Sequence, residues 1–324
     1  MGDTRFGKAI GQAINDAMTA DESVIIMGED IANAGGPFGV TRGLLKSFGA
    51  ERVRDTPISE AAMAGAAVGA ALTGLKPVFE IMFMDFSTLT MDALVNQAAK
   101  ARFMFGGQGS VPMVMRTPHG GGVNAGPQHS QCLEAWMAHV PGLKVVVPSN
   151  PNDAYGLLRS AINDPDPVIF IEHKAMYAKK GELDENPAPV PIGKARVARA
   201  GSDVSVVCYG ALVDESLKAA DALASEGVDV EVIDLRSLQP WDEEAVLATL
   251  KKTHRLVVAH EAVTDFGPGA EIVARMADVG FDELDAPIVR VGARFMPVPF
   301  AKNLEAQYRP NKDAVIDAVR KVLS

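Results

Sequence analysis

Residues 204–236 read VSVVCYGALVDESLKAADALASEGVDVEVIDLR and contain the pattern that decides the fold. Two short apolar runs rich in valine stand at its ends, and a helical pattern that begins near Val213 lies between them. Strands that are almost wholly apolar are typical of a parallel sheet whose two faces are both covered by helices. The stretch therefore predicts an α/β fold.

The same alternation runs through the rest of the chain. Downstream, it predicts helices from Glu243 and Pro268, strands at RLVVAHEA and PIVRVGA, and a closing amphipathic helix at KDAVIDAVRKVL. Upstream, a first helix is indicated by apolar residues at helical spacing, namely Phe6, Ile10, Ile14 and Met18. Five strand candidates follow it: VIIMGEDI from Val24, PVFEIMF from Pro77, VPMVMR from Val111, LKVVVPS from Leu143 and PVIFIEH from Pro167.

A change of composition near Lys179 separates two domains. The segment KKGELDENPAPVPIG combines charged residues with three prolines, which suit neither a helix nor a central strand. We therefore expect a doubly wound domain at residues 1–180, a linker at 181–195, and a second, smaller doubly wound domain at 196–324.

Composition excludes some classes of function. The net charge of -10 argues against a nucleic-acid partner, because phosphates select a basic surface. The two cysteines, Cys132 and Cys208, fit no metal spacing and indicate a reduced, intracellular protein. Without a signal peptide or an apolar run long enough to span a bilayer, the sequence predicts a soluble, cytoplasmic protein.

The usual phosphate-binding motifs are missing. No G-x-G-x-x-G follows a strand and opens a helix, and there is no Walker A motif. GGGVNAG, which begins at Gly120, is rich in glycine but is not followed by a helix start. If the protein uses a cofactor that carries phosphate groups, we expect another chain to hold them.

The first candidate site is the segment RDTPISEAAMAGAAVGAALTGLKP. Ser59 or Thr56 can cap the helix that follows, and Glu60 lies in the first turn, where the helix dipole favours a carboxylate. From Ala61 to Gly74 nearly every residue is small, so another backbone can approach closely. A glutamate that opens such a buried helix is suited to proton exchange with a ring nitrogen, but a purely structural role for Glu60 is equally consistent with the residue types.

Two further stretches contain candidate residues. In EIMFMDFSTLTMDALVNQAAKARFMFGGQ the residue types favour core positions, although the start of this stretch follows a strand, where α/β proteins place ligands. In RTPHGGGVNAGPQHSQCLEAW the glycines and prolines predict a loop that contains His119 and His129. His129 can act in acid–base chemistry or bind an anion, or it can be an ordinary solvated residue; no nucleophile elbow is present.

Together these stretches resemble the beta subunit of the decarboxylating component of 2-oxo acid dehydrogenase complexes, a group of transketolase-like thiamin enzymes. The resemblance covers essentially the whole chain and is carried by these segments, in order: DTPISE, the small-residue helix, DFSTLTMDALVNQAAK, GPQHSQ, PGLKVVVPSNPNDAYGLL, DPDPVIFIEHK and LDAPIVRV…PVPFAKNLE. FGGQ and IFIEHKAMY are most similar to the acetoin and generic bacterial branch of the family. The substrate stays open among pyruvate, branched-chain 2-oxo acids and acetoin.

The resemblance implies a pyrimidine-binding domain followed by a transketolase C-terminal-type domain, and it implies roles for individual residues. Glu60 matches the glutamate that hydrogen-bonds the aminopyrimidine ring of thiamin diphosphate and promotes activation of the cofactor. Phe86 matches the aromatic residue that stacks on this ring, and Ile58 and Met82 match residues that line the same pocket. His129 matches an active-site histidine associated with the substrate and with acyl transfer to a lipoyl group.

Ion sites and partners are also implied by the resemblance. A monovalent-cation (K+) site matches Met113, Ala161, Asp164 and Asp166, although Asp166 stands where a family member has asparagine. The Gly-Asp-Gly signature that holds Mg2+ and the diphosphate is absent, and GED at Gly28 does not replace it. The family's alpha subunit is therefore expected to supply this part of the site.

The expected assembly contains two alpha and two beta chains and binds a dihydrolipoamide acyltransferase core. Its reaction is oxidative decarboxylation of a small 2-oxo acid, or acetoin cleavage, with acyl transfer to lipoamide. Two other interpretations remain open: half of another split transketolase-like enzyme, and a non-catalytic assembly subunit.

Overall fold

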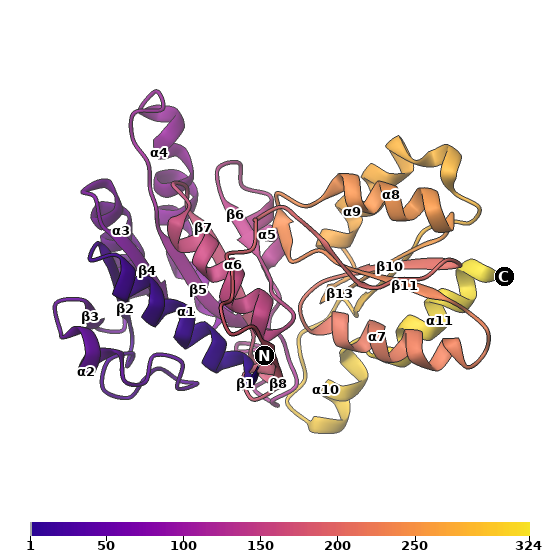
Figure 1. Cartoon of the computed structure of the whole chain (residues 1–324), viewed down its shortest axis with the longest axis horizontal. Coiled ribbons are helices and arrows are strands. Elements are labelled where there is room, and N and C mark those ends of the chain that lie inside the picture. Colours follow the sequence, from indigo (N-terminus) through magenta and orange to yellow (C-terminus); the bar gives the residue numbers. More distant parts are fainter. Residues whose placement is uncertain (1) are drawn as a thin grey trace. The chain divides into compact units, whose positions relative to one another are not determined.

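The computed structural model describes residues 2–324, which form two compact units (Figure 1). The first unit contains residues 2–119 and Trp136–Ile192, and the second contains Gly120–Ala135 and Gly193–Ser324. The loop that contains His129 therefore belongs to the second unit, although it comes from the first half of the chain. A short helix, α5 (Glu134–Ala138), spans one of the boundaries between the units.

The first unit is built on a parallel sheet. Its elements are β1 (Gly2–Arg5), α1 (Phe6–Ala20), β2 (Val24–Gly28), α2 (Leu44–Phe48), β3 (Val53–Asp55), α3 (Glu60–Leu72), β4 (Lys76–Glu80), η1 (Met84–Thr90), η2 (Asp92–Ala98), α4 (Ala99–Met104), β5 (Val114–His119), β6 (Lys144–Val146), α6 (Pro151–Asn163), β7 (Val168–His173), η3 (Lys174–Met176) and β8 (Lys180–Leu183). Within this unit the strands lie in the order β6-β7-β5-β4-β2-β3, and every neighbouring pair is parallel. Strands β1 and β8 form a separate antiparallel pair.

A buried ionic cluster joins three strands of this sheet. The Arg116 guanidinium in β5 donates to Glu80 Oε2 in β4 at 2.6 Å. On its other side it donates to both carboxylate oxygens of Glu172 in β7, at 2.7 and 2.8 Å. The Tyr177 hydroxyl donates to Glu172 at 2.6 Å. All three charged side chains are buried, so the sheet carries a fixed polar cluster within an otherwise apolar core.

The second unit is a smaller sheet with helices on both faces. Its elements are β9 (Arg196–Arg199), β10 (Val204–Cys208), α7 (Ala211–Ala224), β11 (Val230–Asp234), β12 (Ser237–Gln239), α8 (Glu243–Thr253), β13 (Leu256–Val263), α9 (Pro268–Val279), η4 (Phe281–Glu283), β14 (Val289–Ala293), α10 (Lys302–Tyr308) and α11 (Lys312–Leu323). The strand order is β14-β13-β10-β11-β9. Helices α7 and α11 lie on one face and α8 and α9 on the other (Figure 1).

The α/β fold predicted from the alternating pattern is confirmed. Strand β10, helix α7 and strand β11 lie within residues 204–236, and every residue of both strands is buried. Two details differ from a purely parallel pattern. Strand β9 pairs with β11 in the antiparallel direction, and residues 181–183 of the expected linker belong to strand β8 (Lys180–Leu183). Among residues 2–324, no helix has the length and apolar character required to cross a bilayer.

Candidate active site

Glu60 is the first residue of helix α3 and is buried, with 7% of its surface exposed. Neither hydroxyl expected to cap this helix does so. Ser59 occupies the N-cap position without a side-chain cap bond, and the Thr56 hydroxyl donates instead to the sulfur of Met63 at 3.7 Å. The carboxylate of Glu60 is therefore the acidic group in the first turn of α3, where the helix dipole favours a negative charge.

A second buried glutamate lies close to the first. Glu29 directly follows β2, is 6% exposed, and has an Oε1 atom with no hydrogen-bond partner. Burial raises the pKa of Glu29, and the negative charges of Glu60 and Asp30 raise it further. From the sequence alone, the GED segment at Gly28 stood out only because it does not replace a phosphate-binding motif. The signal that could have identified Glu29 is a carboxylate at the carboxyl end of a wholly apolar strand.

The remaining cofactor candidates follow neighbouring strands. Ile58 and Glu60 come after β3, Glu29 comes after β2, and Met82 and Phe86 come after β4. Strands β4, β2 and β3 are adjacent and parallel, so their carboxyl ends meet at one edge of the sheet. That edge is where open α/β sheets bind ligands.

These side chains present apolar surface at the same edge. Ile58 is 84% exposed, and Phe86 and Met82 are half-buried. Phe86 lies in η1, which packs against α3, and its ring contacts Phe83 edge-on at a centroid distance of 5.9 Å. The aromatic contacts continue from Phe83 to Phe38, at 6.1 Å. Phe86 is therefore half-buried and is not the fully buried core residue that its residue type favoured.

The four residues matched to the aminopyrimidine ring fit such a group. A flat heteroaromatic ring needs apolar contacts on its faces and a hydrogen-bonding group at its edge, and ligand sites combine the two in this way. Ile58, Met82 and Phe86 supply the apolar contacts, and the buried carboxylate of Glu60 supplies the hydrogen-bonding group. The first unit contains all four.

His129 is grouped with the second unit and not with these residues. It is half-buried in the loop between β5 and α5, and its backbone N–H donates to the Gly126 carbonyl at 3.3 Å. Two backbone N–H groups of this loop donate to carboxylates of the second unit, Gly121 to Glu261 and Asn124 to Glu305.

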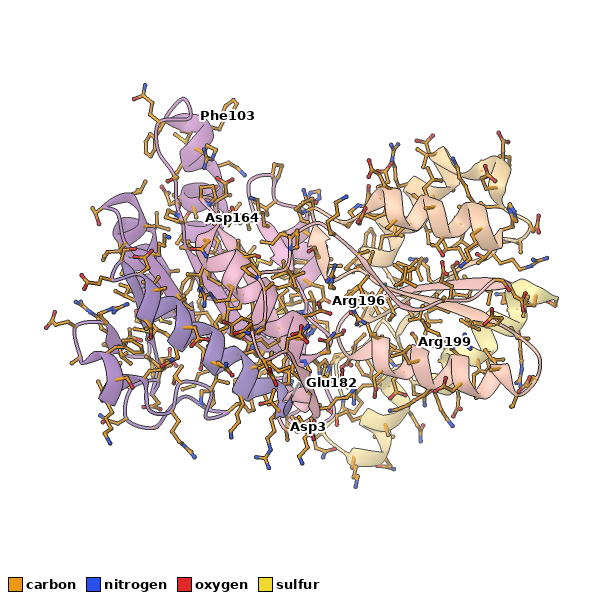
Figure 2. All side chains as sticks on the ribbon, viewed as in Figure 1. Asp3, Phe103, Asp164, Glu182, Arg196 and Arg199 are labelled. Atoms are coloured by element: carbon orange, nitrogen blue, oxygen red, sulfur yellow. The ribbon has the colours of Figure 1, made fainter. Side chains whose placement is uncertain are left out.

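Of the residues matched to a cation site, Ala161 lies near the end of α6, Asp164 (labelled in Figure 2) and Asp166 lie in the turn between α6 and β7, and Met113 directly precedes β5. The Asp164 N–H donates to the Ala161 carbonyl at 3.2 Å, and the Val168 N–H donates to the Met113 carbonyl at 3.0 Å. Both carboxylates at this turn already have cationic partners. Lys144 Nζ donates to both oxygens of Asp164 at 2.7 Å, and the Arg102 guanidinium pairs with Asp166.

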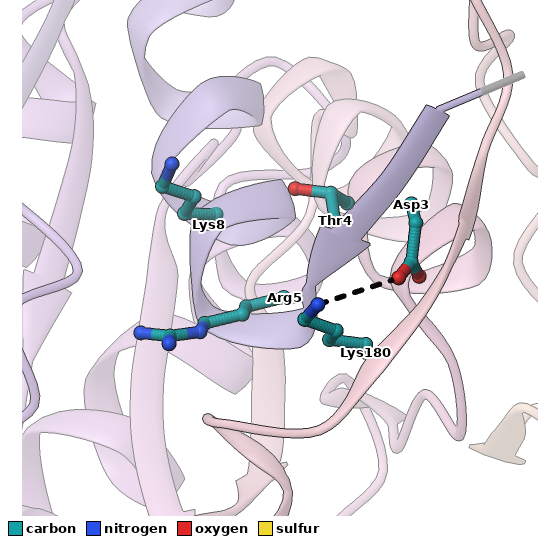
Figure 3. Close-up of a pocket in the computed structure, with 5 residues that line it drawn as sticks. All are labelled: Asp3, Thr4, Arg5, Lys8 and Lys180. Carbon is teal, nitrogen blue, oxygen red and sulfur yellow. Dashed lines mark ion pairs between the residues drawn. The ribbon is translucent and has the colours of Figure 1, made fainter.

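A hollow of about 330 Å³ lies elsewhere on the first unit (Figure 3). It is lined by Asp3, Thr4, Arg5, Lys8 and Lys180. Lys180 Nζ lies 3.7 Å from Asp3 Oδ2, and both side chains are largely exposed. The hollow contains none of the residues selected from the motifs, so it is not part of the candidate active site.

Comparison with protein families gives matches for both units. Residues 3–180 match the model described as the transketolase pyrimidine-binding domain. Residues 193–315 match the transketolase C-terminal domain.

Individual relatives are similar over nearly the whole chain. The beta subunit of acetoin:2,6-dichlorophenolindophenol oxidoreductase from Bacillus subtilis is 46% identical, over 97% of this chain and 96% of the relative. The beta subunit of the pyruvate dehydrogenase E1 component from Acholeplasma laidlawii has the same identity and coverage. The mitochondrial beta-2 subunit of that component from Oryza sativa subsp. japonica is 44% identical, over 97% of this chain and 85% of the relative.

A solved structure, described as a split-gene transketolase in an inactive beta4 tetramer, shares the fold. Its TM-score is 0.82 at 22% identity, and the alignment covers 99% of both chains. At that identity the likeness concerns the fold alone.

Proposed function

Because this chain belongs to the family of transketolase-like dehydrogenase beta subunits, we propose that it forms one part of a thiamin-diphosphate-dependent active site that an alpha subunit completes. Two relatives with the same sequence identity to this chain are named for acetoin and for pyruvate. The proposed substrate class is therefore a small 2-oxo acid or acetoin. The electron and acyl acceptor is lipoamide on a dihydrolipoamide acyltransferase core. The proposed assembly contains two alpha and two beta chains.

The observation that supports this proposal most strongly is the buried carboxylate of Glu60 at the carboxyl edge of a parallel sheet. Thiamin diphosphate, when bound, supplies a carbon nucleophile for the substrate carbonyl and accepts the electron pair released when carbon dioxide leaves. Glu60 would hold a proton at the nitrogen on the edge of the aminopyrimidine ring. Burial suits this role, because a proton shared with a ring nitrogen is not lost to bulk water.

The other residues of this chain orient the ring and the substrate. Phe86 would stack on the pyrimidine face, while Met82 and Ile58 would cover it and exclude water. His129 would contact the substrate carboxylate or carbonyl and exchange a proton during acyl transfer. The chain has no phosphate-binding motif, so the alpha subunit would hold the diphosphate and its Mg2+.

For the monovalent-cation site we propose ligands drawn from backbone oxygens near Met113 and Ala161. The carboxylates of Asp164 and Asp166 are already engaged by Lys144 and Arg102. Hard cations are readily coordinated by carbonyl oxygens, which keep a second lone pair when they accept one hydrogen bond. A melting temperature that is higher in KCl than in tetramethylammonium chloride of equal ionic strength would support this site, and equal temperatures would reject it.

The test of the main proposal is reconstitution with the alpha subunit. Reduction of 2,6-dichlorophenolindophenol is measured with thiamin diphosphate and Mg2+ on pyruvate, 2-oxoisovalerate, 2-oxoglutarate and acetoin. We expect activity from the pair and none from either chain alone, and the preferred substrate identifies the branch. A stable pair that binds the cofactor but turns over none of these substrates would contradict the proposal and favour an assembly subunit.

A further inference from the structure

The loop before His129 has an unusual backbone. Gly120, Gly122, Asn124 and Gly126 all adopt positive φ angles, of 83°, 93°, 58° and 76°. Glycine adopts this region without steric cost and Asn tolerates it, so contacts with neighbouring residues decide which of its accessible conformations the loop keeps. The loop closes on itself, because the Gly120 N–H donates to the Gln131 carbonyl at 3.5 Å.

One of these fixing contacts is a carboxylate from strand β13. Glu261 is 5% exposed, and its Oε1 accepts the Gly121 N–H at 2.6 Å. Arg309 holds the same carboxylate with two parallel bonds, Nε to Oε1 at 3.0 Å and Nη2 to Oε2 at 2.9 Å. Bidentate pairs of this kind fix orientation as well as charge. Glu261 therefore presents its oxygen to the loop from a set direction.

A second carboxylate reaches the loop from helix α10. Glu305 is 3% exposed, and its Oε2 accepts the Asn124 N–H at 3.1 Å. Its other oxygen has no hydrogen-bond partner. A Cβ added at Gly121 would lie 3.1 Å from that oxygen and 2.8 Å from Arg309 Cδ, so only glycine leaves room for this approach. Gly121 thus allows close contact with two buried acids.

The third contact lies next to His129. A Cβ added at Gly126 would fall 2.2 Å from the Phe300 ring, so that ring packs directly on the Gly126 backbone. The Gly126 carbonyl in turn accepts the backbone N–H of His129. The backbone hydrogen bond between His129 and Gly126 therefore links His129 to the residue on which Phe300 packs.

We propose that Glu305, with the Glu261–Arg309 pair and Phe300, positions His129, the proposed acid–base group. These are positioning residues, because they contact the loop and not the reacting atoms. The role of His129 rests on the proposed function, whereas the hydrogen bond between Glu305 and the loop is independent of that function. The first experiment below is therefore independent of activity.

The first experiment measures the loop in the full chain. Amide hydrogen exchange is followed in peptides covering 120–131 for the wild type, Glu305→Ala, Glu305→Gln and Phe300→Ala. We expect Glu305→Ala to raise exchange there about tenfold or more, because bonds to charged groups are among the stronger ones. Glu305→Gln, which keeps an acceptor oxygen, should restore most of the protection. Phe300 is 67% exposed, so its variant should fold even if Glu305→Ala does not.

The matched control is Glu231→Ala. Glu231 is a similarly buried carboxylate of the second unit, whose partners are Thr249, Lys252 and Gly201. Its loss should leave exchange in 120–131 unchanged. In parallel, the imidazole resonance of His129, identified with His129→Asn in 13C-histidine-labelled protein, should move in Glu305→Ala and return in Glu305→Gln. An unchanged loop and an unchanged resonance in both the Glu305→Ala and Phe300→Ala proteins would overturn the inference.

The second experiment uses the reconstituted complex with a lipoyl acceptor. Glu305→Ala and His129→Ala should each lower kcat, and the double variant should be no slower than His129→Ala alone, because both act through one group. Effects that multiply would overturn the positioning role. If the wild-type complex turns over no substrate, the proposed function fails, while the exchange and resonance measurements still decide the inference.

Discussion

Glu29 and Glu60 are two buried carboxylates whose charges interact, although they belong to the ends of different elements. Burial raises the pKa of Glu29 first, and repulsion from Glu60 adds to it. Because Glu29 is buried beside Glu60, ionisation of Glu29 reduces the stability of the folded chain. Such an arrangement is expected where function, and not stability, has selected the residues.

Glu29→Gln should therefore stabilise the isolated chain at neutral pH. A raised pKa in the folded state means that the folded chain binds protons more tightly than the unfolded chain. The free energy of unfolding then falls as pH rises from the ordinary pKa of 4.5 to the raised value. The difference between variant and wild type should be present at pH 7 and vanish below pH 4.5, as measured by urea unfolding. Glu51→Gln, on a side chain that is 95% exposed, is the control and should change little.

Glu60→Gln should remove activity without unfolding the chain. General acid–base groups contribute roughly 100-fold to 10,000-fold to rate, so turnover in the reconstituted complex should fall at least a hundredfold. Glutamine has the same size, so assembly with the alpha subunit should persist in size-exclusion chromatography. Turnover close to that of the wild type would remove Glu60 from the proposed site.

Arg116→Leu should destabilise the first unit severely. The substitution leaves Glu80 and Glu172 buried without their shared cation, at positions that are 4% and 0% exposed. Breaking a buried pair by removing one partner costs about 3–5 kcal/mol. Guanidinium unfolding of the isolated chain measures the loss, and Arg54→Leu on the surface serves as the comparison. A loss under about 1 kcal/mol would show that the cluster is readily solvated when Arg116 is absent.

Two glycine-to-alanine substitutions in helices should have opposite effects. At Gly65 in α3 a Cβ meets nothing within 4 Å, so alanine should stabilise the isolated chain by about 0.5–1 kcal/mol. At Gly269 in α9 the new Cβ would lie 2.7 Å from Nε2 of the buried His260 ring, which should cost about 1–3 kcal/mol. Thermal unfolding of both proteins tests the pair. Stabilisation of both would show that helix propensity outweighs packing at Gly269, and destabilisation of both would contradict the prediction for Gly65.

The sequence predicts the fold well where structure depends on local periodicity. The strand-helix-strand pattern at 204–236 corresponds to β10, α7 and β11 because each element buries its own apolar residues. Strand β9, with the sequence RVAR, could not be assigned in this way. This sequence contains no apolar run, because an arginine stands at each end. The antiparallel direction of β9 is set by its pairing with β11.

The candidate site is predictable only in part, because its partners are far apart in sequence. Glu60 stands out through the small-residue helix that it opens. Glu29 does not, since only the adjacency of β2 and β3 brings it near Glu60. Likewise the glycines of the His129 loop give no indication of Glu261 or Glu305, which follow 140 and 181 residues after the amides that they accept.

That separation affects the order in which a ribosome can complete the molecule. Asn124 is synthesised 181 residues before Glu305, the side chain that accepts its N–H. At about 5–20 residues per second, this interval lasts roughly 10 to 40 seconds. During that time the strands of the first sheet can pair, whereas the loop that contains His129 still lacks the contact with Glu305. His129, the proposed acid–base residue, is therefore among the last parts of the nascent chain to be fixed in position. A chain that ends before α10 would still contain His129 but would lack the contact with Glu305.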